Sequence, residues 1–275
     1  MTTRIVSRSV LRLAAAACLM LPAVLDAAAQ TLPPAASRGA TPAELASVEP
    51  AAPQSLFSGV ATAALPEACP VPDPLLALDG RLDGAIRRVV DDGRLKVLAI
   101  GSSSTRGLGA SSPATTYPAR LEVELERRLP DIAVEVINRG INGEKVAGAI
   151  KRLVAEVEAD RPDLVIWQLG TNDRIKGVTL DKMGEVVMAG IDWLKARGID
   201  AILMDPQFYP KVVGDTGYAE FVAGIDRMAA TSAVPVVRRF DAMRHWASLP
   251  EAVRRPVLAR DNFHMNDQAI PASRR

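Results

Sequence analysis

The chain has 275 residues, of which 48% are hydrophobic, and its formal net charge at pH 7 is +1. Its length allows one large domain or two small ones, and its apolar content allows a substantial buried core. No cluster of Lys and Arg stands out, so we expect no nucleic-acid binding, which needs a concentrated basic surface.

The first 29 residues have the pattern of a secretory signal peptide. Three arginines in the first twelve residues precede an apolar run over 13–25, which is too short to cross a membrane as a helix. Small residues at 27–29 provide a cleavage site. A short membrane anchor is the alternative interpretation. We expect residues 1–29 to be removed, and the mature protein to be periplasmic or secreted with no stable membrane insertion.

Residues 30–74 are rich in Pro, Ala and Ser, which predicts an extended linker. A single domain is therefore expected over 75–275. Cys18 lies in the predicted signal, so Cys69 has no partner for a disulfide in the mature chain.

From residue 82 onward, helical and strand patterns alternate along the chain. Segment 163–169 is almost continuously apolar, as in a strand that is buried on both faces. The helix predicted over 180–197 has Thr179 as its N-cap and Gly198 just past its end. In chain order, the predicted helices cover 82–92, 116–129, 144–159, 180–197 and 218–231, and the predicted strands cover 96–100, 133–138, 163–169, 200–204 and 234–237.

Repeated strand–helix units predict an α/β fold with a parallel sheet covered by helices on both faces. Right-handed crossovers make this a three-layer α/β/α sandwich, and we predict a doubly wound, five-stranded parallel sheet with the flavodoxin-like order 2-1-3-4-5. In such sheets, ligands bind at the carboxyl ends of the strands.

Polar segments follow four of the five predicted strands. A serine hydroxyl, a glycine N–H, an asparagine amide and an Asp/His pair are the parts of an acyl-transfer site, and all four segments fall at the carboxyl edge. Taken singly, each segment has a plainer interpretation as a hydroxyl-rich loop, a turn or a cap. The segments are GSSSTRG at 101–107, NRGING at 138–143, GTND at 170–173 and DNFH at 261–264.

Two histidines are available as the base. Asp261 stands three residues before His264, so on a tight turn its carboxylate orients one ring nitrogen and leaves the other free to accept a proton. A solvated histidine is the alternative for His264. His245 has only Asp241 nearby, and we interpret it as a surface or packing residue of a helix.

The four segments resemble the four blocks of the SGNH (GDSL-type) hydrolases, over about residues 95–268. This resemblance implies that Ser103 is the nucleophile and that Asp261 and His264 complete a catalytic triad. It also implies an oxyanion hole formed by the N–H groups of Ser103 and Gly143 and by the side chain of Asn172. The GTND segment matches the third block of the family without change, and the DNFH segment matches the fourth.

The first block departs from the family pattern, because Ser102 stands where the family usually has Asp. The turn that carries the nucleophile is therefore expected to be held differently. The loop 205–210 follows the fourth predicted strand at the same edge, and we predict that Gln207 and Tyr209 line the substrate cleft. A plain connection with a structural tyrosine is the alternative.

The resemblance implies a serine esterase that hydrolyses small-molecule or glycan esters through an acyl-enzyme, with no cofactor and no metal. Carbohydrate O-acetyl groups are the expected substrate, and a lysophospholipase-like hydrolase of lipid esters or thioesters is the alternative. Two other classes stay open: a nucleotide- or flavin-binding module, suggested by Gly107 and Gly109, and a catalytically silent relative that binds polysaccharide. The sequence gives no indication of the oligomeric state.

Overall fold

The computed structural model describes residues 71–252, 254 and 256–269. The predicted signal peptide and nearly all of the predicted linker lie outside these residues. Among them, no helix has both the length and the apolar character needed to cross a membrane.

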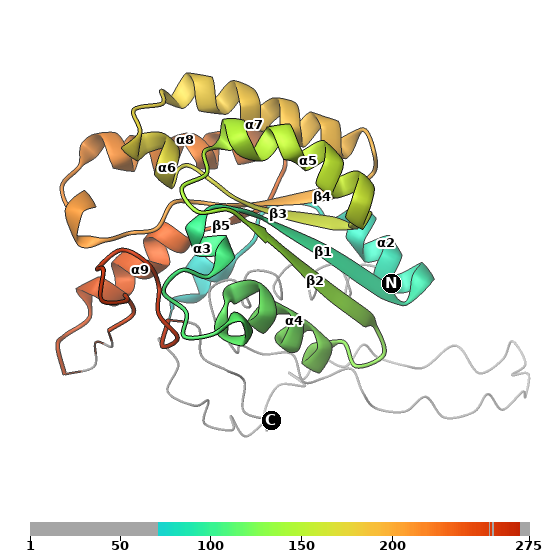
Figure 1. Cartoon of the computed structure of the whole chain (residues 1–275), viewed down its shortest axis with the longest axis horizontal. Coiled ribbons are helices and arrows are strands. Elements are labelled where there is room, and N and C mark those ends of the chain that lie inside the picture. The colour runs from blue at the N-terminus through green and yellow to red at the C-terminus, as the bar shows by residue number, and fades with distance from the viewer. Residues whose placement is uncertain (1–70, 253, 255, 270–275) are drawn as a thin grey trace, which may run out of the picture. The chain divides into compact units, whose positions relative to one another are not determined.

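A five-stranded, all-parallel sheet forms the centre of the domain, and its strand order is β2-β1-β3-β4-β5 (Figure 1). The predicted α/β fold and the predicted order 2-1-3-4-5 are both confirmed. The strands are β1 (Arg94–Gly101), β2 (Ala133–Gly140), β3 (Leu164–Gln168), β4 (Asp200–Met204) and β5 (Val236–Val237).

Side chains that alternate along the strands fill two separate cores, one on each face of the sheet. Val97 and Ala99 of β1 face a core that also contains residues of α2, α4 and α9. Leu98 and Ile100 face the opposite core, which is covered by α5, α7 and α8. The first group of helices comprises α2 (Asp83–Asp92), α4 (Tyr117–Arg128) and α9 (Arg239–Ser248), and the second comprises α5 (Val146–Asp160), α7 (Leu180–Lys195) and α8 (Thr216–Thr231).

Several short helices lie outside the sequence-based expectations. Helix α3 (Ser103–Arg106) follows β1, and α6 (Thr171–Ile175) follows β3. Both begin within three residues of the end of a strand, so they lie at the carboxyl edge of the sheet. No bounds were predicted for α9, although His245, which was interpreted as a residue of a helix, lies in it. The remaining short elements are the 3-10 helices η1 (Asp73–Leu76), η2 (Pro113–Thr115) and η3 (Pro210–Val212).

Candidate active site

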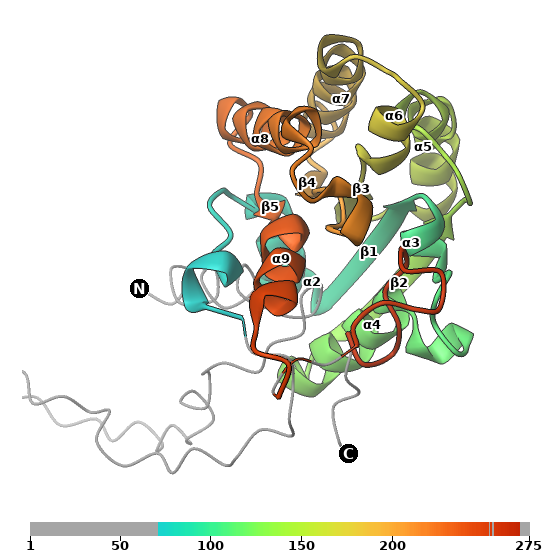
Figure 2. The same ribbon diagram turned by 90° about the vertical axis from the view of Figure 1, so that its left-hand side faces the viewer.

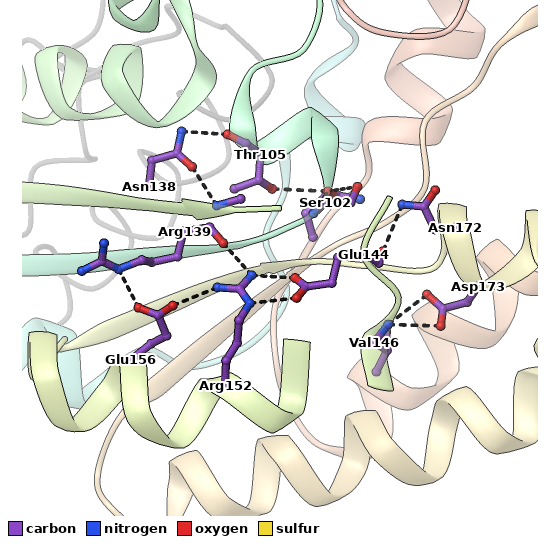
Figure 3. Close-up of polar contacts among 12 residues, drawn as sticks. Ser102, Thr105, Asn138, Arg139, Glu144, Val146, Arg152, Glu156, Asn172 and Asp173 are labelled. Atoms are coloured by element: carbon purple, nitrogen blue, oxygen red, sulfur yellow. Dashed lines mark hydrogen bonds and ion pairs between the residues drawn. The ribbon is translucent and has the colours of Figure 1, made fainter. Parts of the chain in front are cut away.

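The predicted nucleophile is the first residue of a helix packed tightly on the sheet. Ser103 begins α3 two residues after the end of β1 and is 7% exposed. Gly140, the last residue of β2, lies against α3 so closely that a Cβ atom there would stand 2.0 Å from the backbone N of Arg106. Asn138 of β2 also donates a hydrogen bond from Nδ2 to the carbonyl of Thr105 over 2.8 Å (Figure 3). The end of β2 therefore fixes the position of residues 102–106, called here the nucleophile turn.

The imidazole of His264 lies between the hydroxyl of Ser103 and the carboxylate of Asp261. Its Nε2 lies 2.8 Å from the Oγ of Ser103, across 161 residues of sequence. Its Nδ1 lies 2.6 Å from the Oδ2 of Asp261. The segment that carries both residues lies next to α3 in the two views of the chain (Figures 1 and 2). The structure thus brings together the three side chains that the sequence analysis assigned to a triad.

A tight turn orients the carboxylate of Asp261. Its Oδ1 accepts hydrogen bonds from the backbone N–H groups of Phe263 and His264, each over 3.0 Å, while Oδ2 faces the ring. Asn262 adopts a left-handed φ of +54°, which Asn tolerates better than most residues and which folds the turn back. Partial burial opposes the charge of Asp261, but the hydrogen bonds from His264 and Phe263 outweigh it and lower the pKa of the carboxyl. Asp261 therefore stays ionised and holds a proton on Nδ1 of the ring, which leaves Nε2 to accept one.

Aromatic side chains pack against the ring of His264 and against one another. The ring of Phe263 packs edge-on against His264, with centroids 4.8 Å apart, and against Tyr209, with centroids 4.7 Å apart. Tyr209 packs in turn against Tyr218 of α8 at 6.0 Å. An antiparallel bridge between Leu258 and Met265 closes the base of the same loop. These contacts fix the loop 258–265, called here the histidine loop, in which His264 is 7% exposed.

The loop that contains Gly143 is bound to the segment of α6 by three polar contacts. Nδ2 of Asn172 donates to the carbonyl of Glu144 over 3.0 Å, and Nζ of Lys176 donates to the carbonyl of Gly143 over 2.7 Å. The carboxylate of Asp173 accepts from the backbone N–H of Val146, the first residue of α5 (Figure 3). Burial raises the pKa of Asp173, and this hydrogen bond opposes the rise.

An ion-pair network anchors the same loop from the other side. The guanidinium of Arg152 forms a two-point contact with the carboxylate of Glu144, with distances of 2.8 and 2.6 Å. It also donates to the carbonyl of Arg139 in β2 and pairs with Glu156 on its own helix (Figure 3). Gly143 has a left-handed φ of +70°, which glycine adopts without strain. The N–H groups of Gly143 and Ser103 donate no hydrogen bond to another of the described residues.

The two residues predicted to line the cleft are packed into the supporting structure. Gln207 is 2% exposed; its Oε1 lies 3.1 Å from Oγ of Ser104 and 3.4 Å from Oγ1 of Thr171, and its Nε2 donates to the carbonyl of Phe263 over 3.3 Å. Tyr209 is also buried. Substrate contact by either residue stays a prediction. The observed contacts join the nucleophile turn, α6 and the histidine loop through one amide.

Sequence reasoning missed several residues that support the site. It gave no role to Asp173, although this residue is part of the GTND segment that was singled out. It also gave no role to Gln168, whose side chain lies below the nucleophile turn. Both are buried polar residues within four positions of Asn172. Their position at the end of an apolar strand was the available signal, because buried polar groups need hydrogen-bonding partners.

Comparison with known proteins agrees with this architecture. The family model of the non-GDSL lipase-like family matches residues 68–252, a region that ends before the histidine loop. Esterase TesA of Pseudomonas aeruginosa is 27% identical over 116 residues, and Arylesterase of Vibrio mimicus is 27% identical over 132 residues. These alignments cover 42% and 45% of this chain, and they span only 55% and 62% of the two relatives.

A solved structure shares the fold. The crystal structure of TesA superposes with a TM-score of 0.55 and 23% identity, over 64% of this chain and 92% of the other. The recognition of an SGNH (GDSL-type) hydrolase from the four segments is thereby confirmed. The family description also suits the first segment, which has Gly101-Ser102-Ser103-Ser104 in place of Gly-Asp-Ser-Leu. This chain belongs to the non-GDSL lipase-like family.

Proposed function

We propose that this protein is a serine esterase that hydrolyses carboxylic esters through an acyl-enzyme. The observation that carries the proposal is the continuous chain of contacts from the Oγ of Ser103 through the ring of His264 to Asp261, at 2.8 and 2.6 Å. A serine hydroxyl becomes a nucleophile only when a base takes its proton, and this arrangement supplies an oriented base. The names of the two curated relatives, Esterase TesA and Arylesterase, support the same reaction.

The proposed reaction has two halves. Nε2 of His264 accepts the proton of Ser103 as its Oγ attacks the ester carbonyl, and Asp261 stabilises the imidazolium that forms. His264 then donates this proton to the leaving alcohol, which leaves an acyl group on Ser103. In the second half His264 activates a water molecule, which attacks the acyl carbonyl, and the proton returns to Oγ as the acid leaves.

The oxyanion of each tetrahedral intermediate needs hydrogen-bond donors. The N–H groups of Ser103 and Gly143 suit this role, because each is free of partners among the described residues. Asn172 is the third proposed donor. Its amide carries two N–H bonds and uses one on the carbonyl of Glu144, which leaves the second for the oxyanion. Losing one such donor from an oxyanion hole typically costs about 3–4 kcal/mol of transition-state stabilisation.

The proposal is tested by replacing the nucleophile and by labelling it. Ser103→Ala is expected to abolish hydrolysis of p-nitrophenyl acetate, and a fluorophosphonate probe is expected to label the wild type at Ser103 only. Ser104→Ala is a matched control for chemistry, since Ser104 lies one residue away but bonds Gln207 rather than the imidazole. Turnover by Ser103→Ala at the wild-type rate, or labelling elsewhere, contradicts the proposal.

A group of exposed aliphatic side chains favours esters with an apolar acyl group. Four of the seven large hydrophobic side chains that are exposed within the described part of the chain lie in segments that follow a strand at the carboxyl edge, one of them at the end of α6. Contacts made by their sequence neighbours support a position near the site: Lys176 bonds Gly143, and Arg174 bonds Asp215. The loop that contains Leu108 lies close to His264, because a Cβ on the next residue, Gly109, would stand 2.8 Å from the Cβ of His264. The four residues, called here the apolar rim, are Leu108, Ile141, Ile175 and Val213.

The apolar rim supports a lipid-ester or thioester substrate, whereas carbohydrate O-acetyl groups stay the competing proposal. Activity is measured on p-nitrophenyl acetate, butyrate and octanoate and on acetylated xylan. The rim predicts a rise in kcat/KM with acyl length, and Ile175→Asn is expected to reduce this rise. Val123→Asn, which changes a similarly exposed valine on α4, is the control. A preference for acetylated xylan that Ile175→Asn leaves unchanged favours the carbohydrate substrate instead.

We also propose that the enzyme acts in the periplasm or outside the cell, on the strength of the signal-like pattern at 1–29. Expression of the full chain and sequencing of the N-terminus of the fractionated product tests this. Recovery of the uncleaved chain in the cytoplasm contradicts it.

A further inference from the structure

The residue that departs from the family pattern has a buried partner on the neighbouring strand. Gln168 is the last residue of β3 and is 3% exposed. Its Oε1 accepts from the N–H of Ser102 over 2.9 Å and from the Oγ of Ser102 over 2.9 Å. It also accepts from the Oγ1 of Thr105, over 3.3 Å. One amide oxygen therefore receives donors from both sides of Ser103.

The space for this contact exists because Gly101 has no side chain. A Cβ there would lie 2.8 Å from the Cβ and 2.9 Å from the Oε1 of Gln168. It would also lie 2.4 Å from the Oγ1 of Thr105. The glutamine thus fills the position next to the end of β1, directly below the turn that carries the nucleophile.

Serine and aspartate differ in what they offer to an amide oxygen. The hydroxyl of Ser102 donates a hydrogen bond, whereas an ionised carboxylate at this position only accepts. A carboxylate at position 102 would bring only acceptor oxygens to the neighbourhood of Oε1 of Gln168, in place of the hydroxyl that donates to it. If the amide of Gln168 rotated to present its Nε2, the N–H of residue 102 would lose its acceptor, while the hydroxyl of Thr105 would keep Tyr117 as a partner. Either arrangement leaves a buried polar group without a partner, which is costly.

We infer that Gln168 is a positioning residue for the nucleophile, and that Ser102 and Gln168 form a matched donor–acceptor pair that holds the turn in the absence of the family's aspartate. The inference rests on the proposed esterase function, because it concerns the aim of the Ser103 hydroxyl. A misplaced hydroxyl meets the base and the carbonyl less often, so the loss falls on kcat rather than on KM.

A double-mutant cycle tests the pairing. The four proteins are the wild type, Ser102→Asp, Gln168→Met and the double variant, with Ser232→Ala as a control at a buried serine at the C-terminal end of α8. Restoring the family's aspartate alone is expected to lower kcat about 10- to 100-fold, with KM changed less than about threefold. Ser102→Asp is expected to cost clearly less in the Gln168→Met background, because the opposing acceptor is gone. Gln168→Glu, which keeps an acceptor oxygen, is expected to retain more activity than Gln168→Met.

Rates are divided by the concentration of active sites from fluorophosphonate titration, so that misfolded protein does not count. Urea unfolding of the same four proteins measures the coupling without any activity. No coupling in unfolding overturns the pairing. Coupling in unfolding together with a wild-type kcat per active site in Ser102→Asp overturns the positioning role. If the wild type neither hydrolyses esters nor reacts with the probe, the esterase proposal fails, and the unfolding cycle still decides the pairing.

Discussion

Replacing Asp261 with Asn is expected to slow ester hydrolysis more than replacing it with Ala. The two backbone N–H groups of Phe263 and His264 both donate to Oδ1, so the side chain of an Asn would keep its oxygen toward them. Its NH2 group would then face Nδ1 of His264 in place of Oδ2, which is 2.6 Å away in the wild type. Two donors cannot face each other, so the ring proton moves to Nε2, and Nε2 can no longer accept the proton of Ser103.

The expected loss of kcat depends on the solvent exposure of the Asp261 carboxylate. A buried aspartate in a Ser-His-Asp triad loses about 10⁴ in kcat on replacement by Asn. Here the side chain of Asp261 is 45% exposed, so water competes for the ring and allows part of the population to keep the productive tautomer. We expect a loss of about 10²–10³ in kcat for Asp261→Asn, or about 3–4 kcal/mol. Asp261→Ala admits water beside Nδ1 and is expected to lose only about 10- to 100-fold.

The assay is the pre-steady-state release of p-nitrophenol, with Asp241→Asn as the control at an aspartate on α9. A kcat of Asp261→Asn that is at least a third of the wild-type value, or that exceeds the kcat of Asp261→Ala, contradicts this expectation.

The pH dependence of the unfolding free energy provides a second test of the Asp261 carboxylate. Because the pKa of Asp261 is lowered in the folded state, its contribution to the unfolding free energy is present above about pH 4 and is lost as the pH falls through the lowered value. The stabilities of wild type and Asp261→Asn should therefore converge in acid.

Three further changes test the supports of the site. Gly140→Ala places a Cβ 2.0 Å from the backbone N of Arg106, so we expect a destabilisation of at least about 1–3 kcal/mol in urea unfolding; an unchanged midpoint contradicts this packing. Burial raises the pKa of Asp173, so the wild type should lose stability relative to Asp173→Asn as the pH rises from about 4 through the raised value; a pH-independent difference would show that this carboxyl is not desolvated. Gln207→Leu leaves the carbonyl of Phe263 and two hydroxyls without their partner, and should lower kcat about tenfold while KM stays nearly constant; a loss confined to KM would indicate substrate contact.

Short, almost continuously apolar segments predicted the sheet well, because a strand that is buried on both faces needs apolar side chains at successive positions. Val97 and Ala99 face one core, Leu98 and Ile100 face the other, and all four positions are apolar. The predicted strand over 200–204 has the observed bounds of β4. The strand predicted over 234–237 is shorter in the structure, since only Val236–Val237 pair with β4.

The bounds of α9 were not predicted, because the start of this helix is capped by a residue far away in sequence. The carboxylate of Asp205, at the end of β4, accepts from the N–H of Phe240 over 2.8 Å. The guanidinium of Arg239, the first residue of the helix, donates to the carbonyl of Asp205 over 2.8 and 3.1 Å. No local Ser, Thr, Asn or Asp marks the start of the helix, so the usual cap signal is absent. Helices α3 and α6 have four and five residues, too few to show a helical period.

Some residues of the candidate site can be identified from a sequence motif, whereas others can be identified only when the order of the strands is known. Ser103 and His264 stand in segments with a recognisable order of residues, because the chemistry itself constrains their type. Gln168 and Gln207 stand at strand ends with no such constraint, and what they do depends on which strand lies beside them. The order β2-β1-β3-β4-β5 sets the end of β3 beside the turn after β1, where Gln168 contacts Ser102, and Gln207 after β4 contacts Ser104 of the same turn. The sheet order, more than the motifs, therefore identifies the groups that aim the nucleophile.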